Sequence, residues 1–498
     1  MSEPKHFLYI SNPAPGEMNT GLAMMRELLS RGHRVTILSA SSFRQRFEAF
    51  RSRLPKHQAE KFGYVDGGSG REIGDYTPFM QGILNKFRSA PGGDLTFLPA
   101  WEAAVATSLE DSRNAIFAIK KVIEDVNPDV TFVDTFCAVA IDATRATGRP
   151  WIVVVPCGPS VVASPDFIRE PAGLFGQEVN TWTRTFQNVW LVMRLLYYYG
   201  VASKRIAEQR KFRYEVLKFP KIGLIPDSFP CPPVAMVDTL KAALVLQPPG
   251  FNLYLRPETF DRKCFFVGAI ISEEVPTVEG IIETKLADEI KFLDDAHAAG
   301  ADVVYINFGS IFCYSAEEYH ELLSGMEQIH DARPNTRFLW KVPRKFRSAD
   351  SAANGSDVKK DGGDFLAGPV PLEFVMKTNW VQDVTAILKH PATKITVHHG
   401  GGNSTNESLA YEKPQLVFSQ WTDCHELGRT VHKFGVGRQA ENLPHLTANE
   451  LRRNIVEMLE PSEYAKMKAS AQHWALRSRL AGGASACASI AESVAASS

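Results

Sequence analysis

Residues 380–426 read WVQDVTAILKHPATKITVHHGGGNSTNESLAYEKPQLVFSQWTDCHE and contain the clearest local pattern in the chain. Within this stretch the apolar run at 394–398 predicts a strand, which leads through two histidines into three consecutive glycines. Asn403 and Ser404 then offer capping side chains for a helix that begins after the glycines. A strand, a glycine turn and a helix in this order indicate one unit of a parallel sheet covered by helices.

Short β-branched runs alternate with helical periodicity in both halves of the chain, which again indicates parallel sheets covered by helices. A helix opened by the capping box Ser315-Ala-Glu-Glu318 follows the first strand of the second half. We therefore predict an α/β protein with one such domain in each half. The predicted strands are residues 6–11, 35–39, 130–134, 151–155, 303–307, 337–342, 394–398 and 415–419.

The composition restricts the class of protein. The chain has 498 residues, 44% hydrophobic and 22% charged, with 55 basic against 56 acidic residues. A chain of this length normally divides into two or more domains, because single cores seldom grow beyond about 250–300 residues. The balanced charge argues against a nucleic-acid-binding protein, since phosphate affinity needs a basic surplus. Seven scattered cysteines without a Cys-x-x-Cys pair are typical of reduced thiols, so we expect a cytoplasmic location.

Three segments carry expectations about membranes and mobility. The first residues lack the apolar core and cleavage site of a secretory signal. The most membrane-like stretch, residues 189–201, contains Arg194 and is shorter than the roughly 20 apolar residues of a spanning helix. We predict a core helix there, with a membrane-surface helix as the alternative. Residues 348–364 are polar and glycine-rich and predict a mobile surface loop.

The glycine turn has the properties of an anion-binding site, and phosphate is the expected anion. Glycines let the backbone approach a ligand closely, and a helix N-terminus offers free N–H groups and a partial positive charge. His399 can donate a hydrogen bond to the same anion, and Glu407 can accept from two vicinal hydroxyls, as an acidic residue does for ribose. Trp380 offers a face for a nucleobase. A metal site is disfavoured, because His398 and His399 point to opposite faces of a strand.

These residues resemble the signature of UDP-dependent glycosyltransferases of the GT-B fold, in which two facing Rossmann-like domains with parallel sheets enclose a cleft. The signature orders a Trp, a Gln, a His-Pro pair, His-x-Gly-x-Asn-Ser, a Glu, a Pro and an Asp. It stands here as Trp380, Gln382, His390-Pro391, His399-Gly400-Gly401-Gly402-Asn403-Ser404, Glu407, Pro414 and Asp423. Supporting matches are Gly16 and residues 31–35, 133–136, 266–268 and 304–310.

The resemblance implies a domain organisation. Residues 1–255 are expected to form an N-terminal acceptor-binding domain, joined by a linker at 256–280 to a C-terminal UDP-sugar-binding domain at 281–460. Residues 461–498 are expected to form a C-terminal helix that returns to the N-terminal domain.

The resemblance also implies binding roles. Trp380 stacks on uracil, the Val381 backbone reads the edge of the base, and Glu407 holds the ribose hydroxyls. Asp423 hydrogen-bonds hydroxyls of the transferred sugar. The diphosphate lies against the glycine turn, and the residues expected around it are Ser310, His399, Gly401, Gly402, Asn403 and Ser404.

Three positions in this region depart from the pattern of the family. The stretch from Trp380 to His390 is one residue longer than usual, which leaves the role of Gln382 open. Cys424 stands where the family has a Gln or His, and Leu427 stands where an Asn is frequent. Cys424 is kept among the UDP-sugar-binding residues, but the identity of the sugar is open.

The catalytic position departs as well. In the family a His after the glycine of the first strand–helix turn deprotonates the acceptor hydroxyl, and an Asp orients that His; these positions are Glu17 and Asp134 here. Burial beside a second carboxylate raises the pKa of a Glu from about 4.3, which suits a general base. We therefore predict Glu17 and Asp134 as the catalytic pair. The alternatives are an acidic acceptor that needs no strong base, loss of catalysis, and a Glu17 that only favours the helix N-terminus.

The resemblance thus implies inverting transfer of a hexose, with glucose expected, from UDP to an oxygen of a lipophilic phenolic, polyketide, terpenoid or sterol. It implies no metal and no cofactor besides UDP-glucose as co-substrate. The alternative is a catalytically silent UDP-sugar-binding accessory protein. A dinucleotide oxidoreductase is disfavoured, because neither β-α turn carries Gly-x-Gly-x-x-Gly with an acid about 20 residues later. The oligomeric state stays open.

Overall fold

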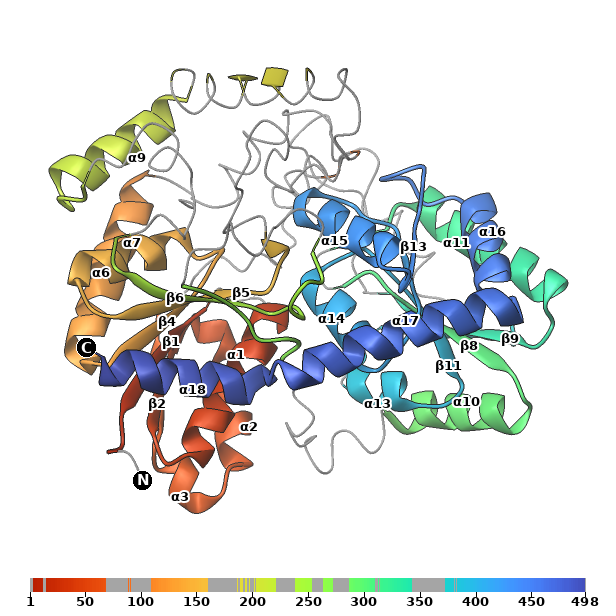
Figure 1. Ribbon diagram of the computed structural model, residues 1–498, viewed down its shortest axis with the longest axis horizontal. Helices are drawn as coiled ribbons and strands as arrows, with labels where there is room; N and C mark the ends of the chain where they lie inside the picture. Colours follow the sequence, from red (N-terminus) through yellow and green to blue (C-terminus); the bar gives the residue numbers. More distant parts are fainter. Residues whose placement is uncertain are drawn as a thin grey trace, which may run out of the picture. The chain divides into compact units, whose positions relative to one another are not determined.

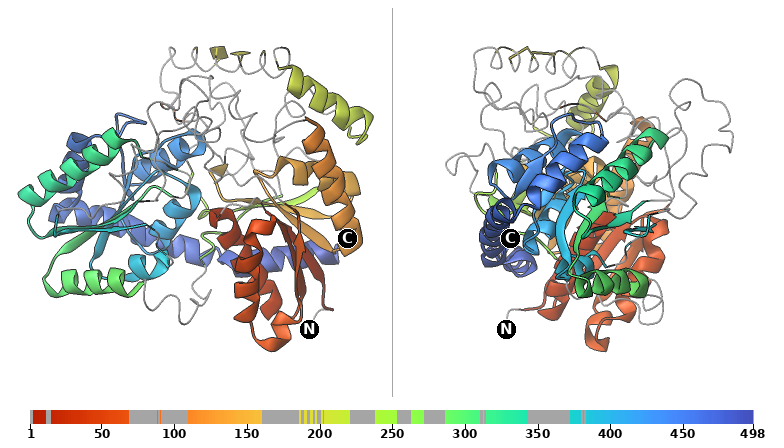
Figure 2. Two further views of the ribbon diagram at one scale, coloured as in Figure 1. Left: turned by 180° about the vertical axis from the view of Figure 1, so that it is seen from behind. Right: turned by 90° about the vertical axis from the view of Figure 1, so that its right-hand side faces the viewer.

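Two parallel sheets, each with helices on both faces, organise the chain (Figures 1 and 2). The chain divides into one unit of Met1–Ile73, Leu98–Val275 and Leu480–Ser498 and another of Gly74–Phe97 and Pro276–Arg479. The computed structural model describes residues 3–11, 15–68, 88, 90, 109–159, 186, 189–190, 193–194, 197, 201, 203–220, 238–252, 263–271, 286–309, 312, 314–342, 372–379, 381 and 383–497, with the backbone only at 15–17, 286–287 and 422.

The first unit contains a seven-stranded parallel sheet in the order β3-β2-β1-β4-β5-β6-β7. Its strands are β1 (His6–Ile10), β2 (Arg34–Ser39), β3 (Phe62–Asp66), β4 (Val130–Asp134), β5 (Trp151–Val155), β6 (Leu240–Val245) and β7 (Cys264–Phe266). The strand order reverses at β1, which pairs with β2 on one side and with β4 on the other. Open parallel sheets bind ligands outside the carboxyl ends of their strands at such a switch point.

Both faces of this sheet are buried, which explains why its strands read as continuous apolar runs. Along β1, Phe7 and Tyr9 belong to one core cluster and Leu8 and Ile10 to another. Successive side chains of a strand point to opposite faces, so one strand contributes to two cores. The described helices of this unit are α1 (Pro15–Ser30), α2 (Arg44–Ser52), α3 (Lys56–Ala59), α6 (Leu109–Val126), α7 (Ala138–Thr147), α9 (Lys204–Glu215) and α18 (Gly483–Ala496), with a 3₁₀ turn at Ser41–Phe43.

The last helix, α18, is part of the core of the first unit. Its Cys487, Ala488 and Ala491 are buried in the same cluster as Phe7 and Tyr9 of β1. Small side chains on this face of α18 let the helix approach the sheet closely. The end of the chain therefore completes a core that the first strand begins.

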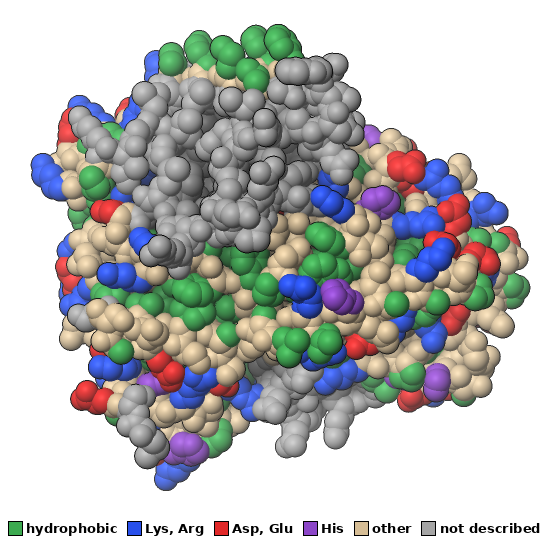
Figure 3. Space-filling view, viewed as in Figure 1, with side chains coloured by type: hydrophobic (Ala, Val, Ile, Leu, Met, Phe, Trp, Pro, Cys, Tyr) green, Lys and Arg blue, Asp and Glu red, His purple; other side chains and the backbone are tan. Residues whose placement is uncertain are grey.

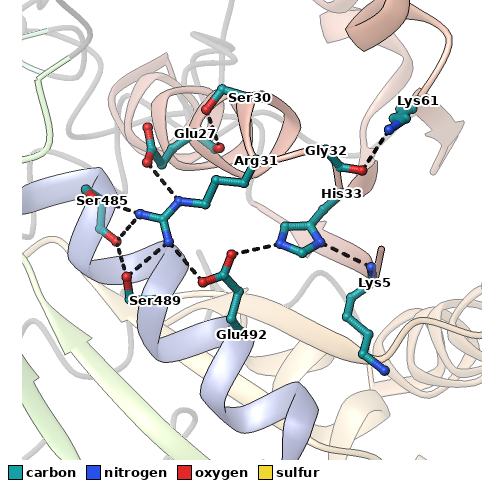
Figure 4. Close-up of polar contacts among 10 residues, drawn as sticks. All are labelled: Lys5, Glu27, Ser30, Arg31, Gly32, His33, Lys61, Ser485, Ser489 and Glu492. Atoms are coloured by element: carbon teal, nitrogen blue, oxygen red, sulfur yellow. Dashed lines mark hydrogen bonds and ion pairs between the residues drawn. The ribbon is translucent and has the colours of Figure 1, made fainter. Parts of the chain in front are cut away.

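A polar cluster fixes α18 beside α1 and β2 (Figure 4). Glu492 accepts hydrogen bonds from Arg31 Nη1 at 3.0 Å and from His33 Nε2 at 2.9 Å. The Lys5 N–H donates to His33 Nδ1 at 3.1 Å, so the proton of the neutral ring lies on Nε2. Arg31 Nη2 also donates to the Ser485 carbonyl oxygen at 2.9 Å. The Arg-Gly-His stretch thus anchors the C-terminal helix.

Replacing Glu492 by Ala is expected to lower the stability of the first unit by about 1.5–3 kcal/mol, because the hydrogen bonds that it removes involve a charged acceptor. His33, whose side chain is 2% exposed, would keep a buried donor without its acceptor. The change in the free energy of unfolding is measured by urea unfolding, with amide exchange in α18 as the probe. Ser493→Ala, an exposed change on the same helix, is the control and is expected to stay within about 0.5 kcal/mol.

The carboxylate of Glu492 also makes the stability of the first unit depend on pH. The hydrogen bond from His33 and the charge of Arg31 lower the pKa of Glu492 below 4.5 although burial opposes them. Its contribution to stability is therefore present above about pH 4.5 and is lost as the pH falls through the lowered pKa. An equal loss of stability on acidification in the Ala variant would contradict this assignment.

The second unit contains a six-stranded parallel sheet in the order β10-β9-β8-β11-β12-β13. Its strands are β8 (Asp302–Asn307), β9 (Thr336–Lys341), β10 (Val375–Thr378), β11 (Thr393–His398), β12 (Gln415–Val417) and β13 (Gly437–Gln439). Its described helices are α10 (Leu286–Ala298), α11 (Ala316–Ala332), α13 (Val384–Lys389), α14 (Gly402–Ala410), α15 (Thr422–Lys433), α16 (Ala448–Met458) and α17 (Pro461–Leu480).

Helices cover both faces of this sheet as well (Figures 1 and 2). Val304 and Ile306 of β8 pack in one core with α11 and α16, while Val303 and Tyr305 pack in the other with α10 and α13. The capping box at the start of α11 is present, with both the Ser315 and the Glu318 hydrogen bonds. The predicted local signal is therefore confirmed.

The domain grouping differs from the predicted boundaries at two places. Residues 74–97 group with the second unit, and of these the structure describes Arg88 and Ala90. Arg88 pairs with Glu318 and donates to the Pro444 carbonyl oxygen at 2.8 Å, which explains the grouping. The expected single C-terminal helix is two helices, α17 in the second unit and α18 in the first, because Gly482 with φ of +94° ends the first of them.

The predicted core helix at 189–201 is wrong for the side chains that the structure describes. Trp190, Met193, Tyr197 and Val201 are helical but 57–69% exposed, and Figure 3 shows hydrophobic side chains gathered at the upper edge of the view. An apolar run indicates a helix, but it does not identify the neighbour that covers the helix. In the described part of the chain, no helix has the length and apolar character needed to cross a membrane. The loop predicted at 348–364 lies outside the described residues.

Candidate active site

The glycine turn joins β11 to α14 at the carboxyl edge of the second sheet. Gly401 occupies the N-cap position and α14 begins at Gly402, so Asn403 and Ser404 lie in the first turn of the helix. The expectation that Asn403 or Ser404 caps the helix is therefore wrong by position. The first N–H groups of a helix have no acceptor within it, and Gly401 at the N-cap position has no side chain that could accept from them.

Two positions of the turn admit only glycine. Gly400 has φ of +88°, and a Cβ there would lie 2.7 Å from the Cys424 carbonyl oxygen. A Cβ on Gly401 would lie 2.4 Å from Nε2 of His399. The turn is therefore pressed against the start of α15 on one side and against the His399 ring on the other.

His399 is partly buried beside this turn. Its ring lies 5.5 Å from that of Trp421, and a Cβ on Gly309 would lie 2.7 Å from its Cε1. Burial, with His398 and Lys341 nearby, lowers the pKa of His399 to about 3. Its Nδ1 is buried and has no hydrogen-bond partner among the described residues. His399 is thus a neutral ring that can offer one N–H to an anion but no charge.

Glu407, one turn into α14, lies in a group of charged side chains. Burial and the neighbouring Asp383 raise its pKa to about 7, although the positive charge of Lys341 opposes this. Burial lowers the pKa of Lys341 to about 8. Lys341 is the last residue of β9 and 6% exposed, and Asp383 caps α13 by accepting from the Ala386 N–H at 3.0 Å. Hydroxyl donors from a ligand would favour the ionised form of Glu407.

Lys341 and Asp383 were not among the residues predicted from the sequence. Lys341 ends the apolar strand of residues 336–341, and a charged residue at that place is the signal that could have identified it. Asp383 is the N-cap residue of α13, two positions after Val381, which is 4% exposed, and no role was predicted for it from the sequence. Both residues act on the pKa of Glu407 through their charges, and their distance from Glu407 in space cannot be read from the order of residues in the sequence.

Asp423 and Cys424 lie in the first turn of α15, next to the glycine turn. Cys424 is 1% exposed, and burial beside Asp423 raises the pKa of its thiol well above the ordinary value. Cys424 is therefore a neutral thiol, and Asp423 is the partly buried acid of the pair. Within the described ranges, no three His, Cys, Asp or Glu side chains are grouped as metal ligands.

Asp134 is the last residue of β4 at the switch point of the first sheet. It is 1% exposed; its Oδ1 accepts from the Phe136 N–H at 2.8 Å, and its Oδ2 is buried without a partner among the described residues. Burial raises the pKa of Asp134 to about 7. A buried carboxyl with one unused oxygen can take up or release a proton near neutral pH.

Glu17 is the third residue of α1, the helix that follows β1. Because β1 and β4 are parallel neighbours, the chain leaves both strands at the same edge of the sheet. The side chain of Glu17 lies outside the described part, as do Ser310, Trp380 and Gln382. The residues that the structure does bring together in the second unit are His399, Gly401, Gly402, Asn403, Ser404, Glu407, Asp423 and Cys424.

Comparisons with known proteins find glycosyltransferases. No family model matches the chain. Over 97% of its length the chain is 26% identical to the erythritol-mannosyl-transferase 1 of Mycosarcoma maydis, and it covers 90% of that protein. It is 24% identical to the chloroplastic crocetin glucosyltransferase of Gardenia jasminoides, over 95% of this chain and 93% of that one.

The chain is a glycosyltransferase and is similar in sequence to UDP-glycosyltransferases.

Solved structures agree on the fold of this glycosyltransferase. The glycotransferase of kitacinnamycin matches with a TM-score of 0.65 at 18% identity, over 99% of this chain and 100% of that one. The calicheamicin glycosyltransferase matches with a TM-score of 0.58 at 15% identity, over 99% and 98%. The predicted two-domain α/β architecture of the GT-B type is confirmed.

Replacing Gly400 by Ala in this glycosyltransferase is expected to destabilise the second unit by more than about 2 kcal/mol. The left-handed backbone alone costs an L-residue about 1–2 kcal/mol, and the contact with the Cys424 carbonyl oxygen adds to it. Gly148→Ala is the matched control, because Gly148 also has a positive φ, of +66°, but nothing within 4 Å of its Cβ position. Urea unfolding measures both; equal losses would show that the contact with Cys424 has no effect.

Proposed function

We propose that the chain transfers a hexose, glucose in the first instance, from its UDP donor to an oxygen of a lipophilic small molecule with inversion at the anomeric carbon. The observation that carries the proposal is the glycine turn, which puts a glycine without a capping side chain at the N-terminus of α14, with His399 and Glu407 beside it. Such a terminus receives phosphate oxygens, and a carboxylate beside it receives ribose hydroxyls.

The reaction forms a bond between the acceptor oxygen and the anomeric carbon as the bond from that carbon to UDP breaks. The proton of the acceptor hydroxyl passes to the carboxylate pair proposed as base, Glu17 and Asp134. The charge left on the β-phosphate is received by the N–H groups at the start of α14 and by neutral His399. Preorganised donors of this kind can stabilise the leaving diphosphate without a metal.

The donor sugar and the acceptor are tested together. UDP release is measured with UDP-glucose and other UDP-hexoses and with nucleotide-linked mannose, each with and without phenols, terpenoids, sterols and erythritol. The relatives' names supply the mannose and erythritol arms. We expect release with UDP-glucose and a lipophilic acceptor, and a product of opposite anomeric configuration. Preference for a mannose donor or for erythritol would replace the proposed sugar or acceptor.

Glu17→Ala is expected to lower kcat for the best acceptor by about 10²–10⁴-fold, the usual contribution of a general base. Glu17→His is expected to restore or raise turnover, because imidazole titrates nearer to neutral pH. Steady-state kinetics at saturating donor measures both variants. Unchanged turnover in the Ala variant would remove Glu17 from the mechanism.

The second candidate is a catalytically silent UDP-sugar-binding protein, and the observation that favours it is Glu17 where the resemblance expects His. Calorimetric titration with UDP separates the two candidates. Tight UDP binding without UDP release from any donor and acceptor pair would establish the silent binder.

A further inference from the structure

His398, the residue before His399, is buried behind the glycine turn and is 2% exposed. The Gly400 N–H donates to its Nδ1 at 3.0 Å, so Nδ1 carries no hydrogen. Its Nε2–H therefore donates to Gln415 Oε1, at 2.9 Å. Burial lowers the pKa of His398 to about 4, which keeps Nδ1 an acceptor at neutral pH.

Gln415 continues this chain of hydrogen bonds into the helix. It is the first residue of β12 and is fully buried. Since its Oε1 accepts from His398, its amide nitrogen is free to donate, and it donates to the Thr405 carbonyl oxygen of α14 at 3.2 Å. Thr405 in turn donates through its N–H to the Gly401 carbonyl oxygen at 3.0 Å. These hydrogen bonds, which we call the relay, start at the Gly400 N–H and return to the carbonyl oxygen of Gly401.

Each donor in the relay has one acceptor, which determines the tautomer of His398 and the orientation of the Gln415 amide. An apolar side chain at 398 would leave the buried Gly400 N–H without an acceptor. A buried donor without an acceptor is costly enough for the turn to rearrange and expose it. The two adjacent histidines therefore differ in role: His399 lies beside the turn with a free Nδ1, and His398 holds the turn from behind.

We propose that His398 and Gln415 are positioning residues, which hold the glycine turn so that the first N–H groups of α14 and the His399 ring converge on the diphosphate of the donor. This inference rests on the proposed function, because it takes the diphosphate as the ligand of the turn. Neither side chain is itself required to touch the ligand.

The test compares UDP affinity, by titration calorimetry, between variants of the relay and a matched control. His398→Phe and Gln415→Leu are each expected to weaken UDP binding by about tenfold or more, the equivalent of one lost buried hydrogen bond. Thr396→Val is the control, because it removes a buried hydrogen bond of 3.0 Å between Thr396 of the same strand and Ser408 of the same helix, away from the turn. It is expected to lower the thermal midpoint but to change the affinity less than twofold.

His398→Asn tests the geometry of the acceptor. The Asn side-chain oxygen can replace Nδ1 as acceptor for the Gly400 N–H, so this variant is expected to recover part of the lost affinity. Unchanged UDP affinity in His398→Phe, or an equal loss in Thr396→Val, would overturn the proposal.

Amide exchange in the protein without nucleotide separates this inference from the proposed function. His398→Phe is expected to raise the exchange rate of the Gly400 amide at least tenfold relative to Thr396→Val, whatever the ligand of the turn proves to be. If the wild-type protein binds no UDP but exchange rises in this way, the proposed function fails and the positioning role stands. If exchange of the Gly400 amide is unchanged, the positioning role fails.

Discussion

Replacing Asp134 by Asn is expected to lower kcat for glycosyl transfer by about 10²–10⁴-fold, the contribution of a general base or of the group that enables it. The carboxyl lies at the end of β4, at the switch point of the first sheet, and its Oδ2 has no partner among the described side chains. Asn keeps the size of the side chain but cannot take up the acceptor proton or stabilise it on a neighbour. Steady-state kinetics with a fixed UDP donor measures the loss.

The pH profile identifies the group. Because burial raises the pKa of Asp134 to about 7, activity that needs its ionised form is expected to rise with pH through about 7, and this rise is expected to disappear in the Asn variant. The effect on stability has the opposite sign: the fold favours the protonated carboxyl, so its contribution is present below about pH 4 and is lost as the pH rises through 7.

Thr135→Val is the control for Asp134. Thr135 is the next residue, fully buried, with a hydroxyl that has no partner among the described residues. Valine has nearly the same shape, so the control is expected to keep the wild-type pH profile. A wild-type profile that persists in Asp134→Asn would assign the titration to another group.

Replacing Arg213 by Met is expected to destabilise the first unit by about 3–5 kcal/mol, the cost of removing one partner from a buried ion pair. Arg213 Nε donates to Asp142 Oδ2 at 2.9 Å, and the two side chains are 2% and 1% exposed. The variant leaves the Asp142 carboxylate between α7 and α9 without its cation. The loss of stability is measured by urea unfolding, with amide exchange in α7 and α9 as the probe.

Two further variants separate the ion pair from general packing. The double variant Asp142→Leu with Arg213→Met removes both charges and is expected to regain most of the lost stability, since a buried pair and an apolar pair of similar size are often equivalent. Lys211→Met breaks the exposed pair with Glu215 on the same helix and is expected to cost less than about 1 kcal/mol. A double variant as unstable as Arg213→Met would show that packing, not the unpaired charge, causes the loss.

Local patterns predicted most of the fold and the family. The strand, glycine turn and helix around residues 394–410 are consecutive in the sequence, so the residues that form them meet whatever the rest of the chain does. The capping box of α11 and the signature are local in the same sense; the structure confirms the capping box, and the comparisons confirm the resemblance to glycosyltransferases. The roles of Glu17, Ser310, Trp380 and Gln382 stay predictions, because their side chains lie outside the described part.

Other features depend on pairs of residues that are distant in the sequence. The charge of Lys341 lowers the pKa of Glu407, because the sheet brings the end of β9 to the same edge as the start of α14, with β8 and β11 between them in the strand order. Burial in the folded chain raises the pKa of Asp134. The fold also pairs Arg213 with Asp142 by a hydrogen bond, although the two residues are 71 positions apart in the sequence. The periodicity of apolar residues predicts helices and strands, but it does not predict which distant residues will be paired.

The sequence by itself determined that this chain alternates strands and helices and that a glycine turn joins a strand to a helix, because both follow from neighbouring residues; that the turn binds a diphosphate stays a prediction. Only the tertiary structure decided what each polar side chain can do there. Of the two adjacent histidines it made His398 a buried support, through Gln415, and left His399 a neutral ring with a free nitrogen beside the turn. The reason is physical: charge state and hydrogen-bonding role depend on burial and on partners, and the fold supplies both.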